Sequence, residues 1–213
     1  LVHKAGFDVA SGKILVLGSG GASVTVCAAL EDLGAMEVIV ISRSGVNNYT
    51  NIDTLHSDAR YIVNTTPVGM YPKNGASPVD LKQFPHCAGV IDLIYNPSAT
   101  KLLLDAENAG ITAVNGLSML TAQAKQSCEI FTGERLDDAV IEKITGEIES
   151  TTKNVILIGM PGCGKSTVGE LLSKKLCRPF IDIDDKIKER IHMTICDFFK
   201  AYGEEAFRKI ETD

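Results

Sequence analysis

The sequence predicts an α/β fold in which a doubly wound parallel sheet is followed by the opening part of a second α/β domain. Two observations predict it. Short runs of β-branched and aliphatic residues alternate with segments of helical spacing, which is the pattern of parallel strands buried on both faces. A strand, a glycine loop and a helix open this pattern, and the same succession starts again after residue 150.

The expected elements of the first domain follow in order along the chain. Its strands are predicted at Lys13–Leu17, Glu37–Ile41, Tyr61–Val63, Ala88–Leu93 and Thr112–Val114. Its helices are predicted at Gly21–Leu33, Ser98–Asn108, Gly116–Phe131 and Leu136–Glu149. The connection after the second strand is short and polar, so we expect little room for a helix there.

A linker is predicted at Ser150–Lys153, because a polar run there ends the last helix before the pattern restarts. The predicted domains are therefore 1–149 and 154–213. In the second domain we expect strands at Asn154–Ile158 and Pro179–Ile183, with a helix at Lys165–Leu176 between them.

Composition excludes some classes of protein. Hydrophobic residues make up 45% and charged residues 23% of the 213 residues, as in ordinary globular proteins. No apolar run reaches the 18 or more residues that a membrane span needs. The net charge of −6 disfavours nucleic-acid binding. Six scattered cysteines without a C-x-x-C pair predict reduced thiols in a cytoplasmic protein.

The first glycine loop, at residues 18–23, follows a predicted strand and opens a predicted helix. This is the setting of the Rossmann-like dinucleotide fingerprint, in which glycines let the backbone approach a pyrophosphate at the helix N-terminus. Ser23 stands where the strict pattern has Gly or Ala, so the loop alone leaves a cofactor site and a plain tight turn both open. The candidate residues are Gly18, Ser19, Gly20, Gly21, Ala22 and Ser23.

The end of the second predicted strand favours NADP over NAD. A ribose-binding acidic residue is expected there in NAD sites, and the sequence instead has Ser42, Arg43 and Ser44. A guanidinium and two hydroxyls suit the additional 2′-phosphate of NADP. The alternative is a solvated arginine at a strand end.

Five segments resemble the cofactor domain of shikimate dehydrogenases, in that family's order and over residues 1 to about 135. They read LVLGSGGAS, ISRSG, NTTPVGMYP, DLIYNP and NGLSMLTAQA. The resemblance implies that residues 18–23 hold the cofactor diphosphate and residues 42–44 its 2′-phosphate. It also implies that Thr65 lines the cofactor cleft, that Leu93 and Gly116 border the nicotinamide, and that Tyr95 and Gln123 contact shikimate.

The chain departs from this family in two ways. Asn47 stands four positions after Arg43, where a second basic residue is usual, which weakens the preference for NADP over NAD. The family's catalytic lysine and aspartate lie in a preceding domain, and His3, Lys4 and Asp8 are not in their context. We therefore expect residues 1–213 to bind NADP without oxidising shikimate.

The second glycine loop, at residues 159–166, fits the P-loop pattern G-x-x-x-x-G-K-[ST] in full. Its backbone N–H groups would cradle phosphates, Lys165 would act on the β and γ phosphates as the catalytic cation, and Ser166 would bind Mg²⁺. The candidate ATP-binding residues are Gly162, Cys163, Gly164, Lys165, Ser166 and Thr167.

Two later segments, PFIDIDDKI and FFKAYGEEAFRKIE, resemble shikimate kinases. The resemblance implies that Asp182 helps to hold Mg²⁺, Asp184 accepts hydrogen bonds from shikimate hydroxyls, and Arg208 binds the shikimate carboxylate. Phe198 and Phe207 could line the substrate pocket, and core packing is the interpretation favoured for either residue alone. The family's lid would follow Asp213, so we expect weak nucleotide binding and negligible phosphorylation by these residues alone.

Together the resemblances imply a fused enzyme of the shikimate pathway with NADP, ATP and Mg²⁺ as cofactors. It would reduce 3-dehydroshikimate to shikimate and phosphorylate shikimate to shikimate 3-phosphate, with small molecules as its partners and its remaining domains on the same parent chain. Two alternatives stay open. One is a non-catalytic NADP-binding module, and the other is a quinate-using dehydrogenase fused to another small-molecule kinase.

Overall fold

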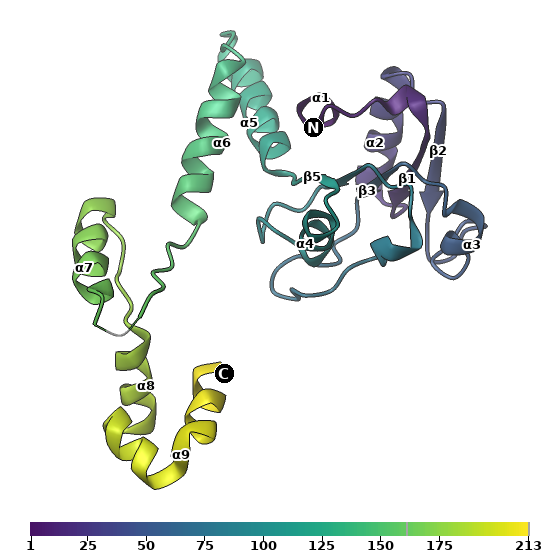
Figure 1. Cartoon of the computed structure of the whole chain (residues 1–213). Coiled ribbons are helices and arrows are strands. Elements are labelled where there is room, and N and C mark those ends of the chain that lie inside the picture. The colour runs from purple at the N-terminus through teal and green to yellow at the C-terminus, as the bar shows by residue number, and fades with distance from the viewer. Residues whose placement is uncertain (161, 213) are drawn as a thin grey trace. The chain divides into compact units, whose positions relative to one another are not determined.

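The computed structural model describes residues 1–160 and 162–212, and it divides into two compact units, Leu1–Thr152 and Lys153–Asp213 (Figure 1). Pro161 of the second glycine loop and the terminal Asp213 lie outside the described residues.

The first unit contains the predicted parallel sheet. Its strands are β1 (Lys13–Leu17), β2 (Glu37–Ile41), β3 (Tyr61–Asn64), β4 (Gly89–Asp92) and β5 (Thr112–Val114), in the order β2-β1-β3-β4-β5. Every neighbouring pair is parallel, and Leu17 is in register with both Ile41 and Asn64. The carboxyl ends of β1, β2 and β3 therefore lie at one edge, where open α/β sheets bind ligands.

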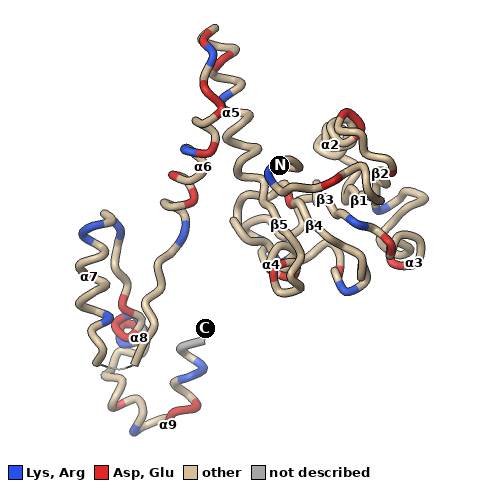
Figure 2. The backbone as a smooth tube through the Cα atoms, turned by 45° about the horizontal axis from the view of Figure 1, so that its top comes forward, with Lys and Arg blue, Asp and Glu red and all other residues tan. Residues whose placement is uncertain are grey.

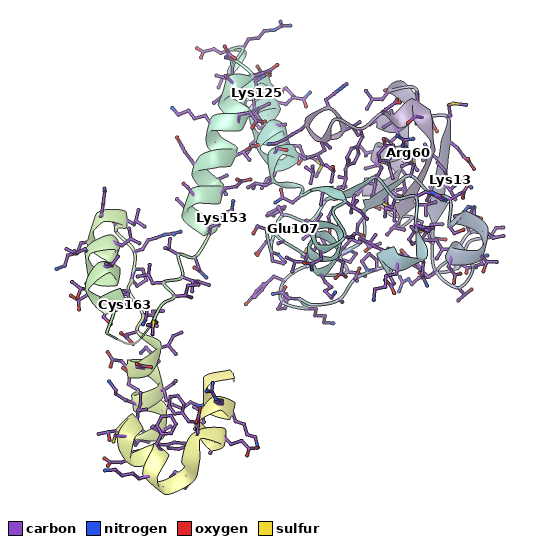
Figure 3. All side chains as sticks on the ribbon, viewed as in Figure 1. Lys13, Arg60, Glu107, Lys125, Lys153 and Cys163 are labelled. Carbon is purple, nitrogen blue, oxygen red and sulfur yellow. The ribbon has the colours of Figure 1, made fainter. Side chains whose placement is uncertain are left out.

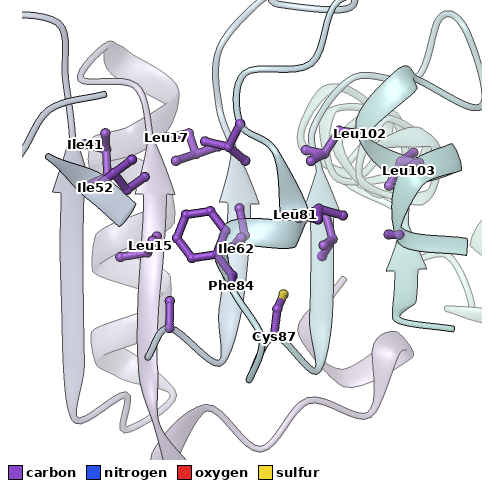
Figure 4. Packing of buried hydrophobic residues seen from close by; sticks show 14 residues of the cluster. Leu15, Leu17, Ile41, Ile52, Ile62, Leu81, Phe84, Cys87, Leu102 and Leu103 are labelled. Atoms are coloured by element: carbon purple, nitrogen blue, oxygen red, sulfur yellow. The ribbon is translucent and has the colours of Figure 1, made fainter. Parts of the chain in front are cut away.

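Helices cover both faces of this sheet. The helices of this unit are α1 (Val2–Ala5), α2 (Gly21–Asp32), α3 (Ile52–His56), α4 (Lys101–Asn108), α5 (Leu117–Thr132) and α6 (Ala139–Thr152), with short 3-10 turns at Val9–Ser11 and Leu81–Gln83. Helices α1 and α2 contribute to the core on one face of the sheet and α3 and α4 to the core on the other, whereas α5 and α6 pack against each other. Alternate residues of one strand enter different cores: Leu15 and Leu17 pack with Phe84 in one (Figure 4), while Ile14 and Val16 pack in the other. Burial on both faces explains the continuous apolar strands, and it confirms the doubly wound fold.

Three boundaries of the first unit lie more than one residue from the predicted position. Helix α4 begins at Lys101 rather than Ser98, because Thr100 caps it by accepting a hydrogen bond from the Leu103 N–H. Helix α6 begins at Ala139 rather than Leu136 and continues through Thr152. Most of the predicted linker Ser150–Lys153 is therefore helical, since its hydroxyls donate to carbonyls of the preceding turn instead of interrupting the helix.

The second unit consists of α7 (Lys165–Leu176), α8 (Ile183–Ile191) and α9 (Ile195–Thr212). The predicted strands at Asn154–Ile158 and Pro179–Ile183 are wrong for this structure, since neither joins a sheet among the described residues. The side chains of Ile156 and Ile158 are 77% and 90% exposed. A strand needs a hydrogen-bonded neighbour and a covered face, and these segments have neither in the described structure.

The core of the second unit joins α8 to α9. Phe198 and Phe207 are each 8% exposed and pack with Ile187, which confirms them as core residues. Gly203 has a φ of 79° inside α9, so the chain bends there in a conformation that favours glycine.

Charged residues lie mainly outside the strands, and both signs occur along the helices (Figure 2). Among the helices of residues 1–160 and 162–212, none combines the length and apolar character that crossing a membrane requires.

Candidate nucleotide-binding loops

The first glycine loop begins at a position that tolerates no side chain. Gly18 follows β1 with a φ of 109°, and a Cβ there would lie 2.8 Å from Oγ1 of Thr65. That hydroxyl donates to the Leu17 carbonyl at 2.7 Å, which ties the end of β3 to the end of β1. Glycine at 18 therefore lets two strand ends meet beneath the loop.

The loop leaves open space where it enters α2. Within the part of the chain that the structure describes, a Cβ on Gly20 or Gly21 would meet no neighbouring atom within 4 Å. The Ser23 and Val24 N–H groups make bonds to the Gly20 carbonyl, so the Gly21 and Ala22 N–H groups precede the helical ladder. An anion could approach these donors directly.

Ser23 has a role that the sequence did not predict. Its side chain is 3% exposed, and its hydroxyl donates to the Gly20 carbonyl at 2.7 Å. The hydroxyl thus closes the first turn of α2 from inside, so any contact of Ser23 with a cofactor would have to involve another group.

The loop after β2 presents Arg43 and Ser44 as exposed side chains. Ser42 turns inward: its N–H donates to the Asn47 carbonyl at 3.1 Å, and a Cβ on Gly45 would lie 2.5 Å from the Ser42 hydroxyl. Burial raises the pKa of Tyr49, and the positive charge of Arg43 opposes this shift.

A buried polar network fixes the loop after β4. Asp92 accepts hydrogen bonds from Asn64 Nδ2 at 3.0 Å, from the Thr100 hydroxyl at 2.6 Å and from the Ile94 N–H at 3.1 Å. Burial raises the pKa of Asp92, while the Thr100, Ile94 and Asn64 hydrogen bonds oppose the shift. Sequence reasoning missed this network, although an aspartate at the end of an otherwise apolar strand could have signalled it.

The network supports the residues predicted near the nicotinamide and shikimate. The Gly116 N–H donates to the Ile94 carbonyl at 3.1 Å, and a Cβ on Gly116 would lie 2.0 Å from the Leu93 carbonyl oxygen, so these predicted neighbours meet. Tyr95 and Gln123 are both exposed, and no hydrogen bond joins them within the described ranges.

The second glycine loop has the backbone of a phosphate cradle in its described part. Gly162 and Gly164 have φ values of 76° and 86°, which let successive N–H groups turn toward one side. Nζ of Lys165 donates to the carbonyls of Gly159 and Met160, each at 2.9 Å. Cys163, labelled in Figure 3, is exposed in the same loop. Nucleotide binding would have to draw the Lys165 amine from these carbonyls to phosphate oxygens.

The structure brings the two predicted magnesium ligands together. The Ser166 hydroxyl donates to Oδ2 of Asp182 at 2.9 Å, and Oδ1 of Asp182 accepts from the Asp184 N–H, capping α8. Among the described residues no group of three carboxylate, His or Cys side chains gathers as a metal site. One or two protein ligands are usual for Mg²⁺ that is bound together with substrate phosphates.

The two residues of the second unit that were predicted to bind shikimate, Asp184 and Arg208, make no contact with each other among the described contacts. Arg208 Nε donates to Glu204 one turn earlier at 3.1 Å, while Asp184 is exposed at the start of α8.

Known proteins resemble both units. The shikimate kinase family model matches residues 161–213. The NADP-dependent shikimate dehydrogenase of Caldanaerobacter subterraneus subsp. tengcongensis is 39% identical over 161 residues, which cover 66% of this chain and 57% of the relative. The corresponding enzyme of Crocosphaera subtropica is 32% identical and covers 62% and 54%.

The chain therefore combines a segment similar to shikimate dehydrogenases with a segment similar to shikimate kinases. Solved structures agree for the dehydrogenase segment. A chorismate mutase/shikimate 5-dehydrogenase fusion protein from Clostridium acetobutylicum has a TM-score of 0.67 and 34% identity, covering 72% of this chain and 60% of that one. A shikimate 5-dehydrogenase from Thermus thermophilus in complex with NADP(H) and shikimate has a TM-score of 0.58 and 30% identity, covering 68% and 58%. The chain spans little more than half the length of these relatives.

Proposed function

We propose that this chain belongs to a parent protein that catalyses two consecutive reactions, NADPH-dependent reduction of 3-dehydroshikimate to shikimate and ATP-dependent phosphorylation of shikimate to shikimate 3-phosphate. The observation that carries the first activity is the open glycine loop at the end of β1, next to the exposed Arg43 at the end of β2. The shikimate kinase match over residues 161–213 supports the second.

In the dehydrogenase segment, the residues of this chain bind and orient. NADPH would supply the hydride. The free N–H groups of Gly21 and Ala22 would bind its diphosphate, and Arg43 with Ser44 would bind its 2′-phosphate. Leu93 and Gly116 would lie against the nicotinamide, on a loop that Asp92 holds in place. Tyr95 and Gln123 would contact the substrate, and Thr65 would line the cofactor cleft.

In the kinase segment, charge neutralisation is the main contribution of the protein, because phosphoryl transfer depends on positioning and electrostatics. The N–H groups of residues 162–167 would hold the ATP phosphates, with Lys165 on the transferred group. Ser166 and Asp182 would bind Mg²⁺ from positions that already touch. Asp184 and Arg208 would bind shikimate after Arg208 leaves Glu204.

The protein would work on small molecules in the cytoplasm, with the remaining parts of both families completing the substrate sites. The cysteines support a reducing compartment, since all six are free thiols in the structure.

The test is direct binding to purified residues 1–213. NADPH should bind, as seen by its fluorescence, with micromolar affinity and more tightly than NADH. MgATP should bind separately and should not compete with NADPH. Absence of NADPH binding at pH 8 by a folded chain would contradict the dehydrogenase assignment.

A further inference from the structure

His56 is the last residue of α3, close to the loop that carries Arg43, and one of its two ring nitrogens has no hydrogen-bond partner among the described residues. The residue is 8% exposed, and Nε2 lies 3.0 Å from Oδ1 of Asn47. Nδ1 is buried without a hydrogen bond to any described group. Because an amide oxygen only accepts, we assign the ring proton to Nε2, which leaves Nδ1 as an unprotonated lone pair.

Asn47 is the residue that closes this loop. Its carbonyl accepts from the Ser42 N–H at 3.1 Å, which joins the two ends of the turn that contains Arg43 and Ser44. Asn51 braces the far side, since its side chain accepts from the Asn48 N–H and donates to the Val46 carbonyl, each at 2.9 Å. The conformation of the loop that carries the exposed Arg43 side chain therefore depends on Asn47, which His56 contacts in turn.

We propose that His56 is a positioning residue for the loop that binds the adenosine end of the dinucleotide, and that the loop keeps its binding conformation only while the imidazole is neutral. This inference rests on the proposed NADPH site. It assigns His56 a role through Asn47 and not a contact with the cofactor.

The surroundings of the ring favour its neutral form. Protonation would place an N–H donor and a positive charge at Nδ1, where the described structure offers no acceptor. Burial lowers the pKa of His56 and Lys13 lowers it further, while Asp58 and Glu37 act in the opposite direction. Lys13, labelled in Figure 3, is paired with Asp58 at 2.8 Å and with Glu37 at 3.6 Å, so these charges partly cancel.

The sign of the pH effect follows from this. A histidine whose pKa is lowered on folding supports the closed loop fully above about pH 6.5, and this support is lost as the pH falls. A protonated ring can reach water only if the loop opens, which withdraws Asn47 and displaces Arg43. Direct electrostatics would have the opposite sign, because an imidazolium near the 2′-phosphate would strengthen NADPH binding in acid.

The test compares NADPH affinity of the 213-residue chain between pH 8.0 and 5.5 for the wild type, H56Q and H86Q. A glutamine amide can replace Nε2–H toward Asn47 but does not titrate, and His86 is an exposed histidine of the same unit that serves as the matched control. Titration of the 2′-phosphate affects all three proteins equally. Between pH 8.0 and 5.5, we expect the NADPH affinity of the wild type and of H86Q to fall by roughly three- to tenfold more than the affinity of H56Q. This difference corresponds to the effect of one hydrogen bond.

A second measurement does not depend on the folding of a variant. By linkage, NADPH must raise the acid dissociation constant of His56 by the same factor by which protonation weakens NADPH binding, so the His56 pKa falls by the logarithm of that factor. The NMR shift of a carbon-bound ring proton of His56 follows this change directly. Equal pH profiles in the three proteins, or a His56 pKa that rises with NADPH, would overturn the inference and leave the proposed function intact. Absence of wild-type binding at pH 8.0 would instead remove the proposed function on which it rests.

Discussion

The two units contain similar sequence patterns but differ in what those patterns form. In the first unit the apolar run Lys13–Leu17 lies between two parallel neighbours, and Ile14 to Leu17 are fully buried. In the second unit the equally apolar run Asn154–Ile158 has no partner strand among the described residues, and Ile158 is 90% exposed. The glycine loop and the helix that follow are present in both. Loops and helices satisfy their hydrogen bonds locally, whereas a strand depends on residues far away in the sequence.

The largest expected effect comes from truncating one buried apolar residue of the first unit and one exposed apolar residue of the second. Phe84 is 1% exposed in the sheet core, so F84A should lower the free energy of unfolding of the first unit by about 3–5 kcal/mol. I158A should change stability by less than about 0.5 kcal/mol. Urea unfolding followed by circular dichroism measures both. A large effect of I158A would show that the Asn154–Ile158 segment is buried in solution.

The two phosphate sites should respond independently to loss of their cations. R43A should weaken NADPH binding by roughly 10- to 100-fold, which is the range for loss of a charge-assisted hydrogen bond, and should change NADH affinity little. K165A should weaken MgATP by a similar factor and leave NADPH unchanged. Isothermal titration of each variant with all three nucleotides makes the comparison. Equal losses of NADPH and NADH in R43A would place Arg43 away from the 2′-phosphate.

A smaller effect is expected from backbone strain within the first loop. G18A forces a Cβ to within 2.8 Å of the Thr65 hydroxyl at a φ of 109°, which should cost about 1–3 kcal/mol of stability. G20A is the matched control, because its Cβ enters open space. Thermal unfolding should therefore separate the two variants. If G20A instead weakens NADPH binding while leaving stability unchanged, the open space at Gly20 belongs to the diphosphate.

The sequence predicted most of the fold of the first unit because each strand is a short run of β-branched and aliphatic residues, which is recognisable from composition alone. All five strands, and the α2 helix after the glycine loop, lie at the expected positions. The candidate loops were likewise found from short local patterns, Gly18–Ser23 and Gly159–Ser166. These patterns depend on backbone conformations that glycine allows, and such requirements are visible in the sequence itself.

What the sequence could not predict depends on contacts between distant residues. Asp92 is joined to Asn64 across 28 positions, and His56 supports the Arg43 loop through Asn47. The residues next to Asp92 and His56 in the sequence do not indicate which side chains they contact. The prediction of strands in the second unit was wrong for the same reason. Composition indicates that a segment can form a strand, but it does not show that a neighbouring strand is available for pairing.

The smallest predicted effect concerns a contact of this distant kind. Thr121 of α5 and Thr145 of α6 are 4% and 3% exposed, and their hydroxyl oxygens lie 2.7 Å apart. T121V should cost about 1 kcal/mol, because it leaves the other hydroxyl without its side-chain partner in a buried place. The double variant with T145V should cost less than the sum of the two single changes, since no polar group then remains unpaired. Urea unfolding of the four proteins completes the cycle, and strict additivity would mean that the two hydroxyls do not interact in solution.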